Sequence, residues 1–285
     1  MRNAGSVRWT SYESLLSQLA MHAFLLLCAF VMLFPFYWMV LTAFRPSQEV
    51  FSPTFQWLPE VFVGFDNFRD AFAKAPLLRF MGNGVLMCAG ILAVQVLTAI
   101  PCAYALAKYE FRGSGLLFAL VLFALCVPVQ VPALPLYMGL AFTGTLDTYF
   151  SMMLPFFLSV FAIFLFRQVF QSFPDDIIHA ARLDGMGEME ILWRVVVPSA
   201  GPAIAAFAVF SVTAHWNDLY WPLIVVTSPE LAPPPLGMMY FSDSDLGSSF
   251  GSLMAAATVL TAPLMLLFLF AQRHFVRGVT MTGVK

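Results

Sequence analysis

The sequence predicts an all-α membrane protein with six transmembrane helices and both termini in the cytoplasm. Of its 285 residues, 60% are hydrophobic and 11% are charged, whereas a soluble domain usually carries about 25% charged residues. The mean hydropathy is +0.83. Six apolar runs are long enough for the roughly 20 residues that cross a bilayer, and the basic residues between them gather on one side. We expect one transmembrane domain over residues 1–285.

The six predicted spans cover residues 18–44, 80–106, 114–142, 148–171, 201–226 and 251–272. The first is too long for a signal peptide, and Arg45 follows it in place of a small-residue cleavage site. The third contains Pro128, Pro132 and Pro135 around Gln130. A helix with these prolines must kink or unwind, which a membrane tolerates where the freed backbone faces protein or water. Gln130 therefore lies either at a packing kink or in a translocation path.

The basic residues predict the orientation of the chain, because they accumulate on the cytoplasmic side of a membrane. If the N-terminus is inside, ten basic residues lie in inner segments and four in outer segments. The inner ones are Arg2, Arg8, Lys108, Arg112, Arg167, Arg182, Arg194, Arg273, Arg277 and Lys285. The outer ones are Arg45, Arg69, Lys74 and Arg79. Both termini are therefore predicted to be cytoplasmic, and so is the segment 172–200.

Segment 172–200 begins with the features of a helix start. Ser172 is a capping residue, proline follows at 174, and the acidic pair Asp175–Asp176 would lie at the positive end of the helix dipole. Asp175, His179 and Arg182 are spaced at i, i+4 and i+7, which places them on one polar stripe. The spacing predicts a short helix with a charged side and an apolar side.

Two glycines, Gly185 and Gly187, then allow a sharp turn. A second helix is predicted over 188–197, with Glu190 and Arg194 paired at i, i+4, until the prolines at 198 and 202 end or bend it. This unit is too hydrophobic for a solvated loop and too charged for lipid. We predict a docking element for a cytoplasmic partner; the alternative is a pair of membrane-surface helices without a partner.

The same segment resembles the cytoplasmic "EAA" motif of permeases of binding-protein-dependent ABC importers, roughly E-A-A-x-x-D-G, a spacer and P-x-x-x-P. The matching residues are Ala180, Ala181, Asp184, Gly185, Pro198 and Pro202. His179 occupies the place of the usual glutamate. The start of the motif with the residues before it, and three other stretches, resemble the carbohydrate branch, in particular the second membrane subunit of maltose and glycerol-3-phosphate importers: "FLFRQVFQSFPDDIIHAARLDG", "YALAKYEFRGSGLLF", "WNDLYWPLIV" and "RGVTMTGVK".

The resemblance implies the fold of a type I ABC importer permease in the cytoplasmic, or inner, membrane. It implies a heterodimer with a sister permease, a dimer of cytoplasmic ABC ATPases on which loop 172–200 docks, and a periplasmic or extracellular solute-binding protein. The cargo would be a sugar, an oligosaccharide or a sugar-like polyol derivative. No G-x-x-x-x-G-K-[ST] motif occurs in the chain, so ATP and Mg are expected on the partner ATPase and no cofactor on this chain.

The fifth span supplies the candidates for a translocation path or gate, which are Trp216, Asn217, Asp218 and Trp221, together with Gln130 in the third span. Polar groups at such depth are costly and usually face a cavity or another helix. Aromatic rings suit the C–H surfaces of sugars. The alternative is an aromatic belt with a polar hinge before Pro222. Maltose-type relatives place most sugar contacts in the sister subunit, which favours a gate over direct recognition.

The segment 227–250 is predicted to be an ordered outer loop or a ligand-reaching finger, because it is rich in proline, glycine and serine. In the family that it resembles, the matching loop points toward the binding protein. The residues that we assign to this role are Pro233, Gly237, Met238 and Tyr240.

Two other classes of membrane protein fit less well. An ion-coupled secondary transporter of a small polar solute should carry ionisable groups in several spans and internal repeats, but only His215 and Asp218 qualify, and both lie in one span. A membrane enzyme should show a metal or nucleophile cluster, yet the four histidines are scattered and the four cysteines lie inside apolar runs. No catalytic residue and no metal site is therefore predicted.

Overall fold

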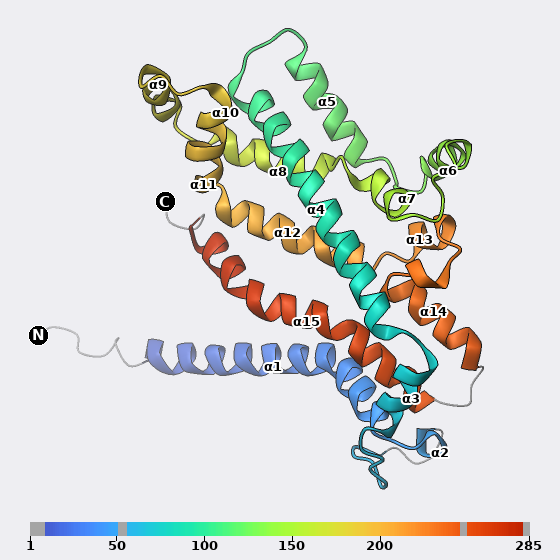
Figure 1. Ribbon diagram of the computed structural model, residues 1–285. Helices are drawn as coiled ribbons and strands as arrows, with labels where there is room; N and C mark the ends of the chain where they lie inside the picture. Colours follow the sequence, from blue (N-terminus) through green and yellow to red (C-terminus); the bar gives the residue numbers. More distant parts are fainter. Residues whose placement is uncertain (1–8, 51–55, 246–249, 282–285) are drawn as a thin grey trace, which may run out of the picture. The chain divides into compact units, whose positions relative to one another are not determined.

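The computed structural model describes the backbone of residues 9–50, 56–245 and 250–281, and within these ranges it consists of helices and connecting loops without a strand (Figure 1). The predicted all-α class is thereby confirmed. The described residues divide into two compact units. One lies within 1–73 and 245–258, and the other within 74–244 and 259–285.

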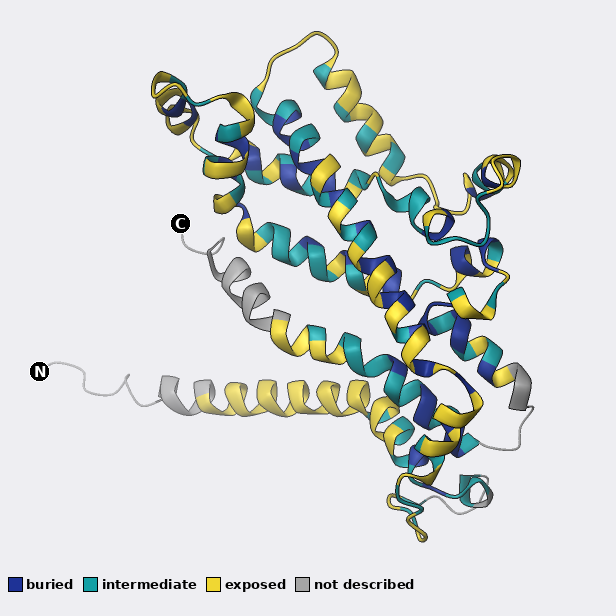
Figure 2. Cartoon of the chain, viewed as in Figure 1, coloured by how far each residue is buried: buried dark blue, intermediate teal, exposed yellow. Residues whose placement is uncertain are grey.

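The first unit is dominated by α1 (Trp9–Ala43), followed by the short α2 (Ser47–Val50) and α3 (Asp66–Lys74). Figure 2 shows α1 exposed along most of its described length. The exposed side chains are mainly leucine, phenylalanine and methionine. A helix that is apolar on all sides and uncovered by protein suits contact with lipid.

The residues that follow α1 are held in place by aromatic and polar contacts. The ring of Phe44 lies 5.1 Å from that of Phe62 and 5.3 Å from that of Phe68, measured between centroids. The amide of Asn67, in α3, donates hydrogen bonds to the carbonyls of Ala43 at 2.9 Å and Arg45 at 2.8 Å. The bond to Ala43 satisfies one of the carbonyls that the end of α1 leaves unpaired, and the bond to Arg45 holds the chain just beyond it.

The second unit is built around α4 (Leu77–Lys108), which packs against α8 (Val160–Gln171) and α12 (Gly201–Trp216). The other helices are α5 (Ser114–Leu125), α6 (Ala133–Phe142), α7 (Tyr149–Met153), α9 (Asp175–Leu183), α10 (Glu188–Ile191), α11 (Val197–Ser199), α13 (Tyr220–Val225) and α14 (Pro234–Asp245). Helix α15 (Phe250–Met281) begins in the first unit and continues in the second.

By length and composition, three described helices can each cross a membrane, namely α1, α4 and α15. Two bent pairs raise the number of candidate spans to five. The predicted third span is not one helix, because α5 ends at Leu125 and α6 begins at Ala133. Pro128 and Pro132 lie in the intervening segment, where their missing N–H groups break the helical ladder. The expectation that the prolines would unwind this span is correct.

The predicted fifth span also consists of two helices. Helix α12 ends at Trp216 and α13 begins at Tyr220, so that Asn217 and Asp218 lie in the break between them. Pro222 lies in the first turn of α13, where the backbone N–H groups have no intrahelical acceptor and its missing donor costs nothing. Asn217 and Asp218 therefore lie in a break between two helices, and not in a continuous helix that bends at the proline.

One hydrophobic core connects the middle of this unit to the segment that the sequence predicted to be a docking element. It contains Phe166 and Phe170 of α8, Ile178 of α9 and Ile191 of α10, together with the facing side of α4 and Phe207 of α12. The apolar side of the amphipathic segment therefore belongs to the core of the bundle, because burial there removes it from water.

Candidate functional site

The turn between α9 and α10 contains a residue in the left-handed region, as the sequence predicted from Gly185. Gly185 has φ +83°, and its amide donates to the carbonyl of Arg182 at 3.0 Å. The next amide, that of Met186, donates to the carbonyl of Ala181 at 3.1 Å. Such bonds close a helix C-terminus around a left-handed residue. Gly187, by contrast, has φ −73° and ψ 155°, which any residue adopts, so the role predicted for this glycine in the turn is wrong.

The start of α9 is held by a lysine rather than by the predicted serine cap. Ser172 belongs to the end of α8, where its hydroxyl donates to the carbonyl of Val169 at 2.8 Å, and α9 has no side-chain cap. Lys108, at the end of α4, donates from Nζ to the carbonyl of Phe173 at 2.6 Å and to Oδ1 of Asp175 at 2.7 Å. The hydrogen bond and charge of Lys108 hold the pKa of Asp175 below its usual value.

The other end of the turn is held by a cluster that we call the Glu188 clasp, formed by Tyr104, Tyr109, Arg182 and Glu188. The carboxylate of Glu188 accepts hydrogen bonds from Nε of Arg182 at 2.6 Å, from the hydroxyl of Tyr104 at 3.4 Å and from the hydroxyl of Tyr109. The hydrogen bonds from Arg182 and Tyr109 lower the pKa of Glu188. The clasp ties both sides of the turn to the end of α4, and sequence reasoning missed it.

Segment 172–200 exposes apolar side chains at the end that lies farthest from the bundle core. The exposed fractions are 90% for Leu183, 64% for Met189 and 45% for Ile177. Ala180, Asp184 and His179 are also exposed, and Nδ1 of His179 lies 3.4 Å from Nη1 of Arg182 on the predicted polar stripe. Ala181 faces the core. An exposed apolar tip on a base that packs in the bundle core has the composition of a surface for a protein partner.

Beyond the turn, the predicted second helix is present but irregular. It runs through α10, a π-helical segment over Leu192–Val196 and α11, and a predicted ion pair joins Glu190 to Arg194. Pro198 and Pro202 each stand in the first turn of a helix, where proline is tolerated. The chain bends by 81° between the segment 188–199 and α12, as the two prolines predicted.

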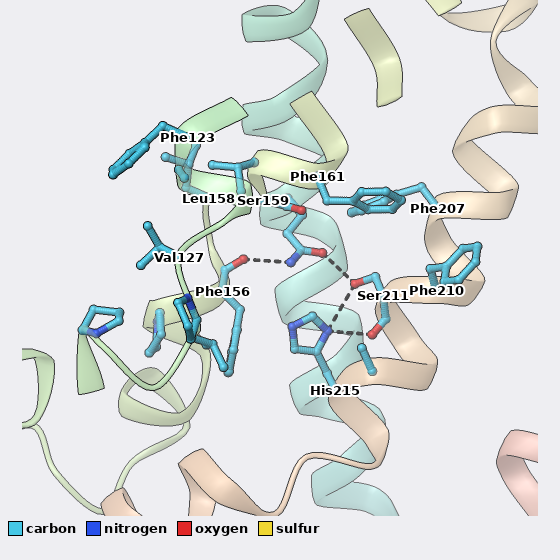
Figure 3. Close-up of a pocket in the computed structure, with 18 of the residues that line it drawn as sticks. Phe123, Val127, Phe156, Leu158, Ser159, Phe161, Phe207, Phe210, Ser211 and His215 are labelled. Atoms are coloured by element: carbon cyan, nitrogen blue, oxygen red, sulfur yellow. Dashed lines mark hydrogen bonds between the residues drawn. The ribbon is translucent and has the colours of Figure 1, made fainter. Parts of the chain in front are cut away.

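A cavity of about 730 Å³ lies between α4, α5, α8 and α12 (Figure 3). Its walls are mostly phenylalanine, leucine and valine, with one polar chain of contacts. Nε2 of Gln95 donates to the carbonyl of Phe156 at 2.9 Å, and the hydroxyl of Ser211 donates to Oε1 of Gln95 at 2.6 Å. Nδ1 of His215 lies 2.6 Å from the carbonyl of Ser211. Gln95 and Ser211 were not among the predicted site residues, although a glutamine inside an apolar run is a signal for such a role.

A second cavity of about 390 Å³ shares His215 and Phe156 with the first. It brings together four of the five residues predicted for a path or gate, which are Gln130, Asn217, Asp218 and Trp221. The backbone N–H of Trp221 donates to Oδ1 of Asp218 at 3.4 Å. Asn217 donates from its side chain to the carbonyl of Thr213 at 2.8 Å.

The two predicted tryptophans are not open aromatic platforms. Trp216 is 5% exposed, lines neither of the two cavities, and donates from Nε1 to the carbonyl of Leu260 at 3.2 Å. Trp221 is 3% exposed, and its Nε1 donates to the carbonyl of Ser151 at 2.8 Å. Both rings pack in the bundle because their N–H groups find carbonyl acceptors there. Trp216 is therefore the one predicted path or gate residue that does not line the second cavity.

The predicted outer loop is largely helical. Helix α14 begins at Pro234, a residue type that suits the first position of a helix. Pro233 and Gly237 are buried, and Gly237 packs so closely on Phe80 of α4 that a Cβ would overlap the ring. Met238 and Tyr240 are partly exposed. Two of the four residues predicted to face a binding protein therefore face the protein interior.

The segment before α14 is fixed by a buried asparagine. Nδ2 of Asn83 donates to the carbonyls of Glu230 and Ala232, both at 2.9 Å, and its Oδ1 accepts from the hydroxyl of Tyr149 at 2.6 Å. Both N–H groups of the Asn83 amide and its oxygen are thus hydrogen-bonded, as is usual for a buried polar side chain.

Comparisons with known proteins agree with this architecture. Residues 95–281 match the family described as binding-protein-dependent transport system inner membrane component. The chain is 33% identical over 266 residues to the arabinooligosaccharides transport system permease protein AraQ of Halalkalibacterium halodurans, covering 90% of this chain and 92% of that protein. It is 30% identical over 264 residues to the sn-glycerol-3-phosphate transport system permease protein UgpE of Escherichia coli O1:K1, covering 90% and 94% of the two chains.

A crystal structure of a bacterial ABC transporter involved in the import of the acidic polysaccharide alginate contains a chain with the same fold. The TM-score is 0.79 at 20% sequence identity, and the match covers 96% of this chain and 100% of that one. With a family match over well more than half of the sequence, an apolar helical bundle and the turn at Gly185, the chain belongs to the inner membrane components of binding-protein-dependent transport systems and is a multi-pass membrane permease.

Proposed function

We propose that this chain is one of two membrane subunits of an ATP-driven importer that takes up a carbohydrate delivered by a solute-binding protein. Its relatives are named for arabinooligosaccharides and sn-glycerol-3-phosphate, and its structural neighbour imports alginate. These names support a saccharide or a sugar-like polyol derivative as cargo. The membrane is the cytoplasmic, or inner, membrane of the cell.

In this proposal residues 1–285 form one permease domain with six spans. The spans are α1, α4, α5 with α6, α7 with α8, α12 with α13, and α15. Both termini lie in the cytoplasm, which the distribution of ten basic residues inside and four outside supports. The breaks in three of the spans lie beside protein or beside a cavity, where unpaired backbone groups are tolerated.

The observation that carries the proposal is the unit 172–200, whose apolar tip is exposed while its base belongs to the bundle core. A cytoplasmic ATPase dimer binds this tip and supplies the site for ATP and Mg. Movement of the ATPase is then transmitted to α4 through Lys108 and the Glu188 clasp, because both connect the unit to the end of that helix. A sister permease completes the path, of which Gln130, Asn217 and Asp218 line this chain's side.

The test is purification of the tagged chain from its native membrane, followed by reconstitution into liposomes. We expect a second permease and an ATPase to accompany it, and uptake of a saccharide to require ATP together with the binding protein. Uptake that is driven by an ion gradient without ATP would instead establish a secondary transporter and overturn the proposal.

A further inference from the structure

The walls of the two cavities carry one formal charge. Among the residues that line them, Asp218 is the only acidic residue, and lysine and arginine are absent. The sequence itself has no lysine or arginine between residues 113 and 166 or between 195 and 272. Helices α5, α6, α7, α12 and α13 therefore bring no lysine or arginine to this region.

No lysine or arginine in the lining of the two cavities pairs with the carboxylate of Asp218. The backbone N–H of Trp221 donates to Oδ1 of Asp218 at 3.4 Å, which caps the start of α13 and does not cancel a charge. His215 lines both cavities and interacts electrostatically with Asp218, while its Nδ1 lies against the carbonyl of Ser211. The remaining polar lining consists of neutral groups, such as the amides of Gln130 and Asn217, which suit sugar hydroxyls.

We propose that Asp218 makes this permease select neutral or cationic saccharides and disfavour anionic ones, such as phosphorylated sugars or uronates. The inference rests on the proposed function and adds the charge class of the cargo. Two like charges about 10 Å apart at an effective dielectric constant of about 20 repel each other enough to lower occupancy roughly tenfold.

The test uses the complete importer, with its ATPase and binding protein, in proteoliposomes. Three matched probes differ only at the reducing end: arabinotriose, its anionic aldonate and its cationic reductively aminated derivative. Each uptake rate is divided by that of the wild type for the same probe, so the binding protein's own preference cancels. We expect Asp218→Asn to raise the aldonate-to-neutral ratio about tenfold and to lower the ratio for the cationic probe.

Asparagine retains the oxygen that accepts from Trp221, so Asp218→Asn removes charge while leaving the helix cap. Gln130→Lys adds the opposite charge to the same cavity and should also raise the aldonate ratio. Asp70→Asn, which removes an exposed carboxylate on α3, is the matched control and should leave both ratios unchanged. Assembly of each variant is verified by co-purification of the ATPase.

Two results would overturn the inference while leaving the proposed function intact. One is a set of unchanged uptake ratios in assembled Asp218→Asn and Gln130→Lys importers. The other is an anionic cognate ligand, identified by a thermal-shift screen of the binding protein against neutral, cationic and anionic saccharides. ATP-independent uptake of the probes would instead contradict the proposed function itself.

Discussion

The backbone conformation of one residue sets the shape of the turn between α9 and α10. Gly185 has φ +83°, which is costly for a β-branched residue, whereas Gly187 has an ordinary extended conformation. No atom lies within 4 Å of a Cβ built at either position. A Cβ at either site therefore meets no neighbouring element, and the main difference between the two sites is the backbone angle.

We expect Gly185→Val to destabilise the turn by about 1–2 kcal/mol and to lower substrate uptake while ATP hydrolysis continues. Gly185→Asn should be milder, because asparagine tolerates the left-handed region. Gly187→Ser is the matched control and should be neutral or slightly stabilising, because serine fits this backbone conformation and can cap α10. Hydrogen exchange over 180–190 in the assembled importer measures the turn. Equal exchange in Gly185→Val and wild type would contradict the assignment.

The Glu188 clasp differs from the neighbouring ion pair in what it connects. Glu188 joins α10 to α9 and to the end of α4, whereas the Glu190–Arg194 pair lies on one exposed helical surface. An exposed i, i+4 pair contributes only about 0.3–0.5 kcal/mol. Charge-assisted bonds between separate elements contribute more and also restrict relative movement.

We expect Glu188→Gln to loosen the unit by about 0.5–1 kcal/mol, a modest value because the carboxylate is 44% exposed to water. Glu190→Gln should have a smaller effect. The measurement is the rate of hydrogen exchange in α9 and α10, together with the ratio of transported sugar to hydrolysed ATP. If Glu190→Gln perturbed both quantities as much as Glu188→Gln, the clasp would have no special role.

At the scale of elements, the contact between α4 and α14 depends on a missing side chain. A Cβ at Gly237 would overlap the ring of Phe80, which is 2% exposed and has little room to move. A Cβ at Gly84 of α4 would lie 2.7 Å from Pro234, at the start of α14. Helix α14 can approach α4 because glycine occupies these two positions.

We expect Gly237→Ala to destabilise the purified permease by about 1–3 kcal/mol through overpacking. Gly139→Ala is the matched control, because Gly139 lies in exposed α6 with no atom near its Cβ direction, and it should be neutral or slightly stabilising. The double variant with Phe80→Leu should recover part of the loss. Thermal unfolding monitors all three, and a Gly237→Ala variant as stable as wild type would show that the contact can relax.

At the scale of the whole molecule, the proposed topology places unit 172–200 inside and α14 outside. Single cysteines at Met189 and Ser242, both exposed, are introduced after replacement of Cys28, Cys88, Cys102 and Cys126. In intact cells, a membrane-impermeant maleimide should label Ser242→Cys and should reach Met189→Cys only after the membrane is opened. Labelling in the opposite sense would contradict the six-span arrangement with internal termini.

Much of the molecule could be predicted from short stretches of sequence. The apolar runs became α1, α4 and α15, because the need to satisfy backbone groups in lipid forces such runs into helices. The left-handed turn at Gly185 and the ion pair between Glu190 and Arg194 also depend on residues within a few positions of one another. The break in the third span could likewise be predicted, because it depends on the prolines within that span.

The tertiary structure decided the contacts between distant residues. Tyr109 and Glu188 are 79 positions apart, and Gln95 and Ser211 are 116 apart. Sequence periodicity reports which side of a helix is apolar, but it does not say which neighbour covers that side. The burial of Trp216 and Gly237 and the gathering of Gln130 with Asp218 at one cavity therefore followed from packing, since each depends on where two helices meet.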